Sequence, residues 1–238
     1  MSKYNTLWEY VQKTEKESFQ LTFEEIQKIA GIPIDHSFLK YKKELAEYGW
    51  QVGKISMKEQ TVFFQRKKMI QLVRPTEAWE EQSAAFKQEF FDHGEAVING
   101  SELLDQTNDY RAWCRSIDAN TKEETVHPDW VITDTFFAVD DQRRIVGIID
   151  LRHTLNDFLK DLGNCGYSVR PSERKKGFAT EMLRQLLDVA RKAGMKELHL
   201  SVEKNNEPSV KTIIQNGGVY ERSFEFNGEE ADIYRIVL

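Results

Sequence analysis

The pattern of apolar and polar positions divides the chain into segments with two different periods. Apolar residues recur at spacings of three and four in some segments, which predicts amphipathic helices, and near-alternate or continuous short apolar runs predict strands in others. The predicted helices cover residues 5–14, 21–31, 35–48, 76–94, 109–120, 177–194 and 207–218. The predicted strands cover residues 18–21, 69–75, 133–140, 143–153, 163–171 and 196–204, with one pair in 50–65 and another in 218–238.

The first segments, up to about Lys68, follow the order helix, short strand, helix, turn, helix and hairpin. Thr22 and Glu25 form a capping-box pattern at the start of the second helix, and Gly31 marks its end. This is the order of a winged helix-turn-helix. We therefore expect a small winged-helix-like domain at residues 1–68.

From about Met69 the order changes to strand, two helices, three mostly antiparallel strands, helix, strand, helix and two strands. The last two strands flank Asn227-Gly228, a dipeptide that favours a tight hairpin turn. This order predicts an α+β fold for residues 69–238, with a mixed, mostly antiparallel sheet, flanking helices and one parallel crossover.

Charge is distributed unevenly between these two parts. The whole chain carries a net charge of −6. Residues 1–68 contain 12 Lys and Arg against 9 Asp and Glu, which leaves 21 against 30 for the remainder. A mildly basic head on an acidic body supports a division into two domains. Three excess positive charges are a weak field for nucleic-acid binding, and the acidic body favours a cationic ligand.

Cysteine content and hydropathy narrow the class of protein further. The two cysteines, Cys114 and Cys165, lack CxxC spacing, so we expect small buried thiols rather than a disulfide framework or a metal site. No apolar run approaches the roughly 20 residues that cross a bilayer. The N-terminus lacks the apolar core of a signal peptide. We therefore expect a cytoplasmic protein that does not enter a membrane.

The stretch "GYSVRPSERKKGFATEML" places a charged turn directly before an amphipathic helix. The first amides of a helix lack intrahelical partners and carry partial positive charge, so they bind anions. Gly177 removes a side chain where an anion must approach, and Arg174, Lys175 and Lys176 add positive charge. A solvated turn with a glycine bend is the alternative interpretation. The spacing fits neither a Walker loop nor a Rossmann fingerprint.

Together with its surroundings, this turn resembles the GNAT superfamily of acyl-CoA-dependent N-acyltransferases. The family's [Q/R]-x-x-G-x-[G/A] loop is matched by "RKKGFA", residues 174–179. The family's V-x-x-x-N-x-x-[A/S] pattern is matched by Val202, Asn206 and Ser209. The resemblance covers about residues 69–238, and it extends to a bacterial subgroup of predicted acetyltransferases.

The resemblance implies an N-acetyltransferase that uses acetyl-CoA as cosubstrate and acetylates a primary amine by direct attack. In that fold the strands on either side of residues 170–195 splay apart, and pantetheine lies in the gap like an added strand. The residues implied for coenzyme A binding are Tyr167, Ser168, Val169, Arg174, Lys175, Lys176, Gly177, Phe178, Ala179, Thr180, Asn206 and Ser209.

A general base is expected, because a lysine-like ammonium with a pKa of about 10.4 must lose a proton before it attacks. Asp150 and His153 are the candidates, and Asp157 follows closely. The pKa of free histidine suits the role. Structural alternatives remain open, since Asp150 can pair with Arg152 and Asp157 can cap the next turn.

The general acid departs from the family pattern. The usual tyrosine, seven residues after the asparagine, is Ile213 here. Tyr167 or Tyr220 would then donate the proton, or the thiolate leaves unaided. Several family members have a histidine at the position of Asn164, so no base is expected there.

Two functions remain open, and they differ in the role of residues 1–68. The first is the acetyltransferase, which acts on a small-molecule or peptide amine. The second is an acyl-CoA-binding module with little catalysis, in which residues 1–68 dock protein or nucleic acid. The expected recognition helix, residues 35–48, lacks the Arg, Asn and Gln that favour direct base reading, so protein docking is preferred. The oligomeric state stays open, with a homodimer as one arrangement.

Overall fold

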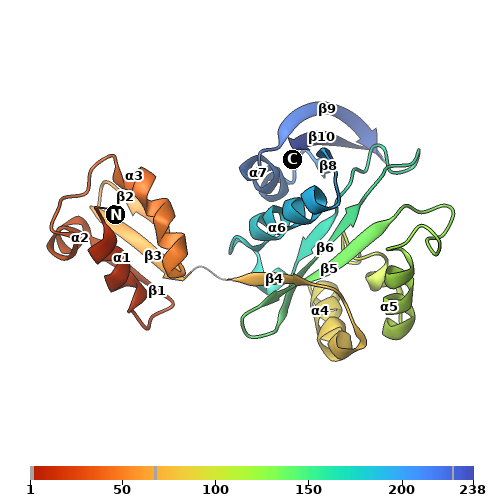
Figure 1. The fold of residues 1–238 in the computed structure, drawn as a ribbon, viewed down its shortest axis with the longest axis horizontal. Helices are drawn as coiled ribbons and strands as arrows, with labels where there is room; N and C mark the ends of the chain where they lie inside the picture. Colours follow the sequence, from red (N-terminus) through yellow and green to blue (C-terminus); the bar gives the residue numbers. More distant parts are fainter. Residues whose placement is uncertain (1–2, 67–68, 227) are drawn as a thin grey trace. The chain divides into compact units, whose positions relative to one another are not determined.

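The chain folds into two compact units, Met1–Met69 and Ile70–Leu238 (Figure 1). The computed structural model describes residues 3–66, 69–226 and 228–238. The predicted domain boundary after Lys68 lies outside the described residues. Each unit has hydrophobic clusters made of its own residues, and each is described by itself.

The N-terminal unit combines short helices with a three-stranded antiparallel sheet of order β1–β3–β2. This sequence of elements agrees with the predicted one, and a winged-helix-like character remains a prediction. Its elements are α1 (Asn5–Gln12), β1 (Ser18–Thr22), α2 (Phe23–Ala30), α3 (Phe38–Tyr41), the 3₁₀ helix η1 (Lys42–Tyr48), β2 (Trp50–Ser56) and β3 (Thr61–Arg66).

The prediction of one continuous α-helix over residues 35–48 is wrong. The segment forms a single α-helical turn, α3, and continues as the tighter η1. Side chains three residues apart align along a 3₁₀ helix, so Leu45 and Tyr48 lie on one side, where they join the core. Gly49, with a left-handed φ of 75°, ends the segment.

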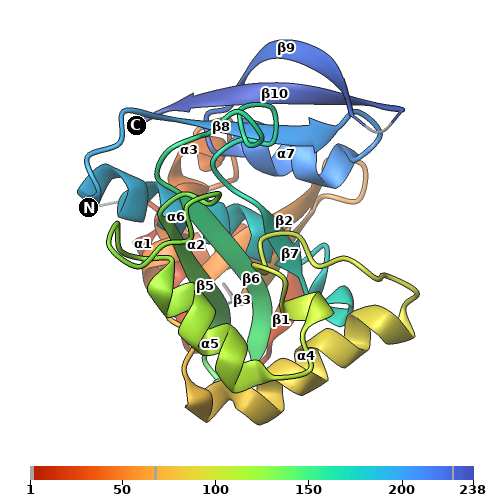
Figure 2. The same cartoon turned by 90° about the vertical axis from the view of Figure 1, so that its right-hand side faces the viewer.

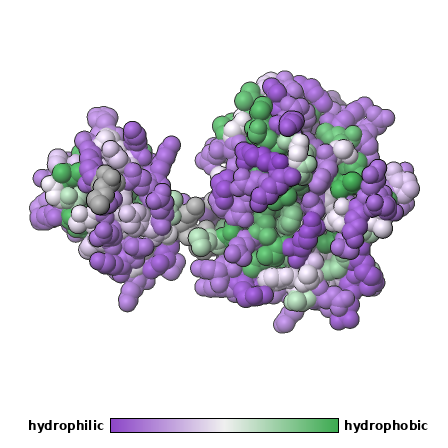
Figure 3. All heavy atoms as spheres, in the orientation of Figure 1, coloured by the Kyte–Doolittle hydropathy of each residue, from purple (hydrophilic) through white to green (hydrophobic). Residues whose placement is uncertain are grey.

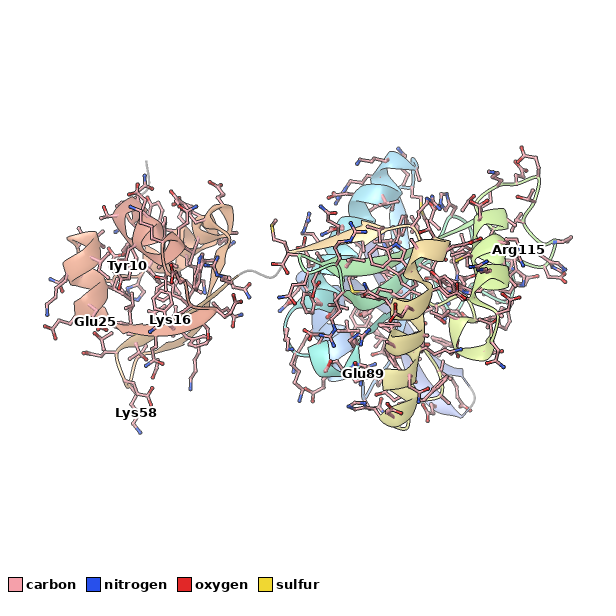
Figure 4. All side chains as sticks on the ribbon, turned by 90° about the horizontal axis from the view of Figure 1, so that it is seen from below. Tyr10, Lys16, Glu25, Lys58, Glu89 and Arg115 are labelled. Atoms are coloured by element: carbon pink, nitrogen blue, oxygen red, sulfur yellow. The ribbon has the colours of Figure 1, made fainter. Side chains whose placement is uncertain are left out.

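The capping box predicted at the start of α2 is confirmed. The hydroxyl of Thr22 accepts a hydrogen bond from the amide of Glu25 (3.2 Å), and the Glu25 carboxylate, labelled in Figure 4, accepts one from the amide of Thr22 (2.7 Å). A cap of this kind stabilises a helix by about 1 kcal/mol. Below it, the core of the unit consists of Tyr4, Leu7, Trp8, Val11, Leu21, Ile26, Phe38, Leu45, Trp50, Val62 and Phe64.

The C-terminal unit has the predicted α+β order. Its first half contains β4 (Ile70–Val73), η2 (Glu77–Trp79), α4 (Glu80–Asp92), η3 (Leu104–Gln106), α5 (Tyr110–Ala119), β5 (Thr133–Asp140) and β6 (Ile145–Arg152). Its second half contains β7 (Tyr167–Val169), η4 (Pro171–Glu173), α6 (Phe178–Lys192), β8 (Glu197–Glu203), α7 (Glu207–Gln215), β9 (Val219–Phe226) and β10 (Glu229–Val237). In the predicted turn between the last two strands, Asn227 lies outside the described residues, and Gly228 has a φ of 82°.

This unit contains two antiparallel sheets, of order β4–β5–β6–β7 and β8–β10–β9. In Figure 2, β5 and β6 run through the middle, and β8, β10 and β9 lie across the top. Helix α6 covers one face of β5 and β6, and α4 with α5 covers the other (Figure 1). The buried face of α6 is apolar because its nonpolar residues recur at helical spacing. These residues are Phe178, Met182, Leu183, Leu186, Leu187 and Ala190.

Asn164 joins the two sheets just before they separate. Its amide donates to the carbonyl of His199 on β8 (2.6 Å), and its side-chain Oδ1 accepts from the His199 amide (2.9 Å). Its Nδ2 donates to the carbonyl of Arg152 on β6 (3.0 Å). The observed strand β7, Tyr167–Val169, is therefore shorter than the predicted strand at 163–171. Residues 163–166 instead connect the two sheets.

The surface is predominantly polar. The face of each unit in Figure 3 is mostly hydrophilic, as expected for a chain in which 30% of the residues are charged. Across residues 3–66, 69–226 and 228–238, the structure contains no helix with the length and apolar character needed to cross a membrane.

We predict that Asn164→Ala destabilises the C-terminal unit by about 2–4 kcal/mol, because it removes a buried side chain that bonds to both the His199 amide and the Arg152 carbonyl. In a domain of this size, that loss lowers the melting temperature by about 5–10 °C. Thermal unfolding followed by circular dichroism measures it. Asn205→Ala, at an exposed position, is the matched control, and an equally small effect of both substitutions would contradict the bridging role.

Candidate active site

Within the described residues, β7 pairs along one edge with β6, and its other edge faces a gap. The carbonyl of Gly166 and the amide of Arg170 both bond to β6. Successive residues of an antiparallel strand point their backbone groups to opposite sides, so Tyr167 and Val169 direct theirs away from β6. The side chain of Arg174 reaches the Val169 carbonyl from that side (3.2 Å). The gap thus offers backbone groups of β7 to an extended ligand, although the Val169 carbonyl already accepts from Arg174.

A cavity of about 630 Å³ connects this strand edge with the N-terminus of α6. Eleven of the twelve residues implied for coenzyme A binding line it, and Lys176 is the exception within the described chain. The structure therefore brings together residues from β7, the following loop, α6 and α7, which are separated by up to about 40 positions in the sequence.

Gly177 gives the N-terminus of α6 its open approach. Its φ is 85°, a left-handed conformation that side chains other than glycine rarely adopt. Apart from Gly177 and its chain neighbours, no heavy atom of the described residues lies within 4 Å of the position that a Cβ would take. No described side chain caps α6, so its N-terminal turn can bind an anion beside Gly177.

Two of the three cations in the loop are already paired. Arg174 holds both carboxylate oxygens of Glu95 (2.6 and 2.7 Å), and these hydrogen bonds lower the pKa of Glu95. Lys176 lies 3.0 Å from Glu173. Lys175 lines the cavity with a φ of 62° and has no ion-pair partner in the part of the chain that the structure describes. Lys175 is therefore the cation most available to a ligand.

Glu89 on α4, labelled in Figure 4, anchors the segment that precedes the loop. Its carboxylate lies 2.8 Å from the guanidinium of the buried Arg170 and accepts the amide hydrogen of Ser172 (2.8 Å). Burial opposes ionisation of Glu89, but the hydrogen bonds from Ser172 and Arg170 outweigh it and lower the pKa. This network holds η4 in place and thereby sets where the loop begins.

Asn206 and Ser209 connect α7 to β7. Asn206 caps α7, because its Oδ1 accepts the amide hydrogen of Ser209 (3.2 Å). The hydroxyl of Ser209 in turn forms a 2.5 Å hydrogen bond with the hydroxyl of Tyr167. Burial raises the pKa of Tyr167, so the phenol keeps its proton. The two pattern residues thus position a neutral tyrosine inside the gap.

Two further cavities continue from the first. One, of about 520 Å³, occupies the gap between β7 and β8 and shares Asn99, Tyr167 and Ser209 with the first cavity. The other, of about 330 Å³, shares Gly100 and Arg152 with the middle one. A path of three adjoining cavities therefore runs from the N-terminus of α6, through the gap, to the end of β6.

Asp150 lies beneath this path but is fully buried. Its carboxylate accepts the amide hydrogen of Gly166 (2.5 Å) and lies 2.7 Å from the guanidinium of Arg152. The ion pair with Arg152, given above as the structural alternative, is thus observed. These contacts make Asp150 a group that orients β7 and Arg152.

His153 lies next to a different set of charges. Its Nε2 is 2.9 Å from the carboxylate of Asp134, which also pairs with Arg74. Burial opposes ionisation of Asp134, but the hydrogen bonds from His153 and Arg74 outweigh it and lower its pKa. None of the three cavities is lined by His153 within the described residues. Asp157 is exposed, and Asn156 caps the adjacent turn instead.

The candidate proton donors also differ in position. Ile213, at the family's tyrosine position, is buried in the core and lies under Gly218. Tyr220 is 53% exposed and bonds to Ser223 (3.0 Å), and it lines none of the three cavities in the described part of the chain. Tyr167 is the candidate that lies in the gap.

Glu102 is a residue that the sequence analysis missed. It lines the 330 Å³ cavity together with Arg152. Burial raises its pKa to about 8, and the nearby Asp150 contributes further to the rise. No local motif marks Glu102, since its environment depends on residues about 50 positions away. The side chains of Ser101 and Asp105, on either side of Glu102, bond to each other (2.9 Å).

Comparison with known proteins agrees with this architecture. A family model described as an acetyltransferase (GNAT) domain matches residues 72–219. No curated protein matches the chain. Among solved structures, a GNAT-family protein from Bordetella pertussis has a TM-score of 0.52 at 15% identity, over 78% of this chain and 98% of its own.

Two other similar structures were solved with a ligand. The microcin C7 self-immunity acetyltransferase MccE, in complex with acetyl-CoA and AMP, has a TM-score of 0.52 at 18% identity, over 71% of this chain and 92% of its own. An acetyltransferase-like protein from Salmonella typhimurium, solved with acetyl-CoA, has a TM-score of 0.51 at 15% identity, over 71% of this chain and 93% of its own. At these identities, the likenesses establish the fold.

We predict that Lys175→Gln weakens coenzyme A binding about three- to tenfold, because a charge-assisted contact at an exposed site contributes roughly 1 kcal/mol. Lys176→Gln is expected to change the affinity less than about twofold, since that lysine is paired with Glu173 and does not itself line the cavity. Isothermal titration calorimetry at low and moderate salt measures both. Equal losses in the two variants would contradict the assignment of Lys175 as the available cation.

Proposed function

Because this chain belongs to the GNAT family of acetyltransferases, we propose that it transfers the acetyl group of acetyl-CoA to a primary amine. The observation that carries the proposal is the path of three cavities through the gap between β7 and β8. Two substrates must meet to react, and the path has room for one at each end. The splayed strands lie between them.

The residues present fit acetyl-CoA at the α6 end of the path. The uncapped amides of α6, the open approach at Gly177 and the unpaired Lys175 together suit a pyrophosphate. The free edge at Tyr167 and Val169 suits the amide groups of pantetheine, which can bond as an added strand would. Acetyl-CoA supplies the acetyl group as an activated thioester.

Backbone and side chain in the gap have separate roles in this proposal. Backbone amides along β7 that face the gap stabilise the negative charge that develops on the acyl oxygen. Tyr167, which keeps its proton and lines both adjoining cavities, donates to the departing sulfur. In this role Tyr167 takes the place of the family's usual tyrosine, whose position is occupied by Ile213 in this chain.

The cavity at the end of β6 supports a particular class of acceptor. Its volume of about 330 Å³ suits a small molecule or the first residue of a peptide. Exposed apolar side chains surround it, namely Val97, Leu103, Trp130 and Phe158. Asp105 and Asp129 add negative charge at the same wall. We infer an amine that is attached to a short aliphatic or aromatic group.

The N-terminal unit is compatible with the alternative function, an acyl-CoA-binding module that docks a partner through residues 1–68. Its elements follow the order expected of a winged-helix-like docking domain. A protein-docking role is preferred to nucleic-acid binding, because α3 and η1 carry no Arg, Asn or Gln. If the chain bound acetyl-CoA without turnover, the acyl-CoA-binding module would be the better description.

We predict that the chain releases thiol from acetyl-CoA when phenethylamine or tyramine is added, with kcat/KM at least about tenfold higher than for spermidine or ethanolamine. Burying a short apolar group is worth roughly 1–3 kcal/mol, which corresponds to that ratio. A thiol-reactive dye reports the release, and mass spectrometry identifies the acetylated amine. Binding of acetyl-CoA with no turnover for any amine would contradict the proposed function, and a preference for spermidine would contradict the acceptor class alone.

Tyr167→Phe is expected to lower kcat about tenfold or more, because it removes the proton donor from the gap and keeps the ring. Tyr220→Phe serves as the control, since this phenol lies outside the cavities and should retain full turnover. Steady-state kinetics with the preferred amine distinguish the two. Full turnover in both variants would leave an unassisted thiolate as the account of the leaving group.

A further inference from the structure

Glu102 lies on a turn with an unusual backbone. Glu102 and Leu103 both have positive φ, 48° and 66°. Two consecutive residues other than glycine in this conformation are strained. Just before them, Gly100 lies so close to β7 that a Cβ would meet the Gly166 carbonyl oxygen at 2.2 Å. The turn is thus pressed against the start of β7 and held in a conformation that isolated chains avoid.

A clamp from α5 holds this turn. The indole Nε1 of Trp113 donates to the carbonyls of both Ser101 (3.0 Å) and Glu102 (2.9 Å). Trp113 is itself buried in the cluster beneath α4 and α5. The side chain of Glu102 is therefore presented by a rigid support, as functional groups with a demanding geometry require.

The Glu102 carboxyl adjoins Asp150 in a buried environment. Its Oε2 is inaccessible to solvent and has no hydrogen-bond partner in the described residues. The nearby Asp150 adds to the effect of burial on the pKa of Glu102. Burial raises the pKa of both carboxyls. Asp150 accepts from the Gly166 amide and from Arg152, whereas no described residue donates to Oε2 of Glu102. The single proton of the pair therefore resides on Glu102.

We propose that Glu102 is the catalytic base of this chain, the carboxylate at the wall of the 330 Å³ cavity that takes a proton from the acceptor amine. This assignment rests on the proposed function. It follows from the clamped turn, from the pairing with Asp150 and from the position of Glu102 beside Arg152, which lines both this cavity and the gap.

With Glu102 as the base, every proton of the reaction has a donor and an acceptor. An acceptor ammonium gives one proton to the Glu102 carboxylate and becomes a neutral amine. The nitrogen lone pair forms the bond to the acetyl carbon, the carbon–sulfur bond breaks, and its electron pair leaves on sulfur. The second nitrogen proton passes to the sulfur through Tyr167 or water. Glu102 then releases its proton to solvent, so no further reactant is needed.

Several charged groups set the proton affinity of Glu102. Asp150 opposes its ionisation and Arg152 favours it, both from β6. Asp105 and Asp129 line the same cavity from the two flanking loops. With a pKa of about 8, Glu102 accepts a proton readily and still ionises in a useful fraction of molecules near neutral pH. Activity should accordingly rise with pH through about 8 and then level off.

Glu102→Gln tests the assignment sharply, because glutamine resembles the protonated carboxyl. Its amide can still donate to Asp150 and adds no charge, so a purely structural role would survive the substitution. A role as catalytic base would be lost, because glutamine cannot take up the proton, and kcat should fall about 100-fold or more. The rise in kcat/KM near pH 8 should move toward the pKa of the free amine. Melting temperature and acetyl-CoA affinity should stay near those of the unmodified chain.

Two further variants complete the test. Glu102→Asp keeps a carboxylate, so it should retain part of kcat, and its kcat/KM should still rise near pH 8. Glu124→Gln, at an exposed position outside the cavities, should leave kinetics unchanged. Full turnover of Glu102→Gln with an unaltered pH profile would overturn the assignment while the unmodified chain still acetylates amines. Absence of transfer in the unmodified chain would overturn the proposed function and the assignment with it.

Discussion

The separation of β7 from β8 is the constraint on which the rest of this unit depends. Asn164 bonds to β6 and β8 at once, and Gly163 approaches β8 so closely that a Cβ would meet the His199 carbonyl oxygen at 2.3 Å. Beyond this junction the two strands belong to different sheets. The gap therefore opens where the strands continue past the junction at Gly163 and Asn164. Its exposed backbone edge can bind an extended ligand without any change in the fold.

The charged groups along this gap differ in whether they have a partner of opposite charge. Most ionised groups near it are compensated, as in the pairs Arg174–Glu95 and Asp150–Arg152. At the α6 end, Lys175 is the cation without an ion-pair partner in the described residues, and at the other end Glu102 is a carboxyl without a donor to stabilise its charge. A phosphate and an amine are the chemical groups that suit these two ends. The chemistry of the site thus follows from the groups that the fold leaves uncompensated.

Much of this was predictable from the sequence, and the failures have identifiable causes. The α+β order and the phosphate loop depend on local signals, because helix faces, Gly177 and the capping residue Asn206 are each set by near neighbours in the chain. The continuous helix over residues 35–48 failed because packing of Leu45 favours a tighter 3₁₀ turn. Glu102 was missed because its properties arise from Asp150 and Trp113, which local patterns do not relate to it.

Amide hydrogen exchange with and without acetyl-CoA tests the central claim most directly, since it reports where the ligand lies. If the splayed strands and the N-terminus of α6 form the binding site, saturating acetyl-CoA will slow exchange at residues 167–169 and in the first turn of α6, residues 178–181. Residues 3–66 should exchange at the same rate with and without the ligand. Binding that leaves both segments unprotected, or that protects the N-terminal unit alone, would contradict the account.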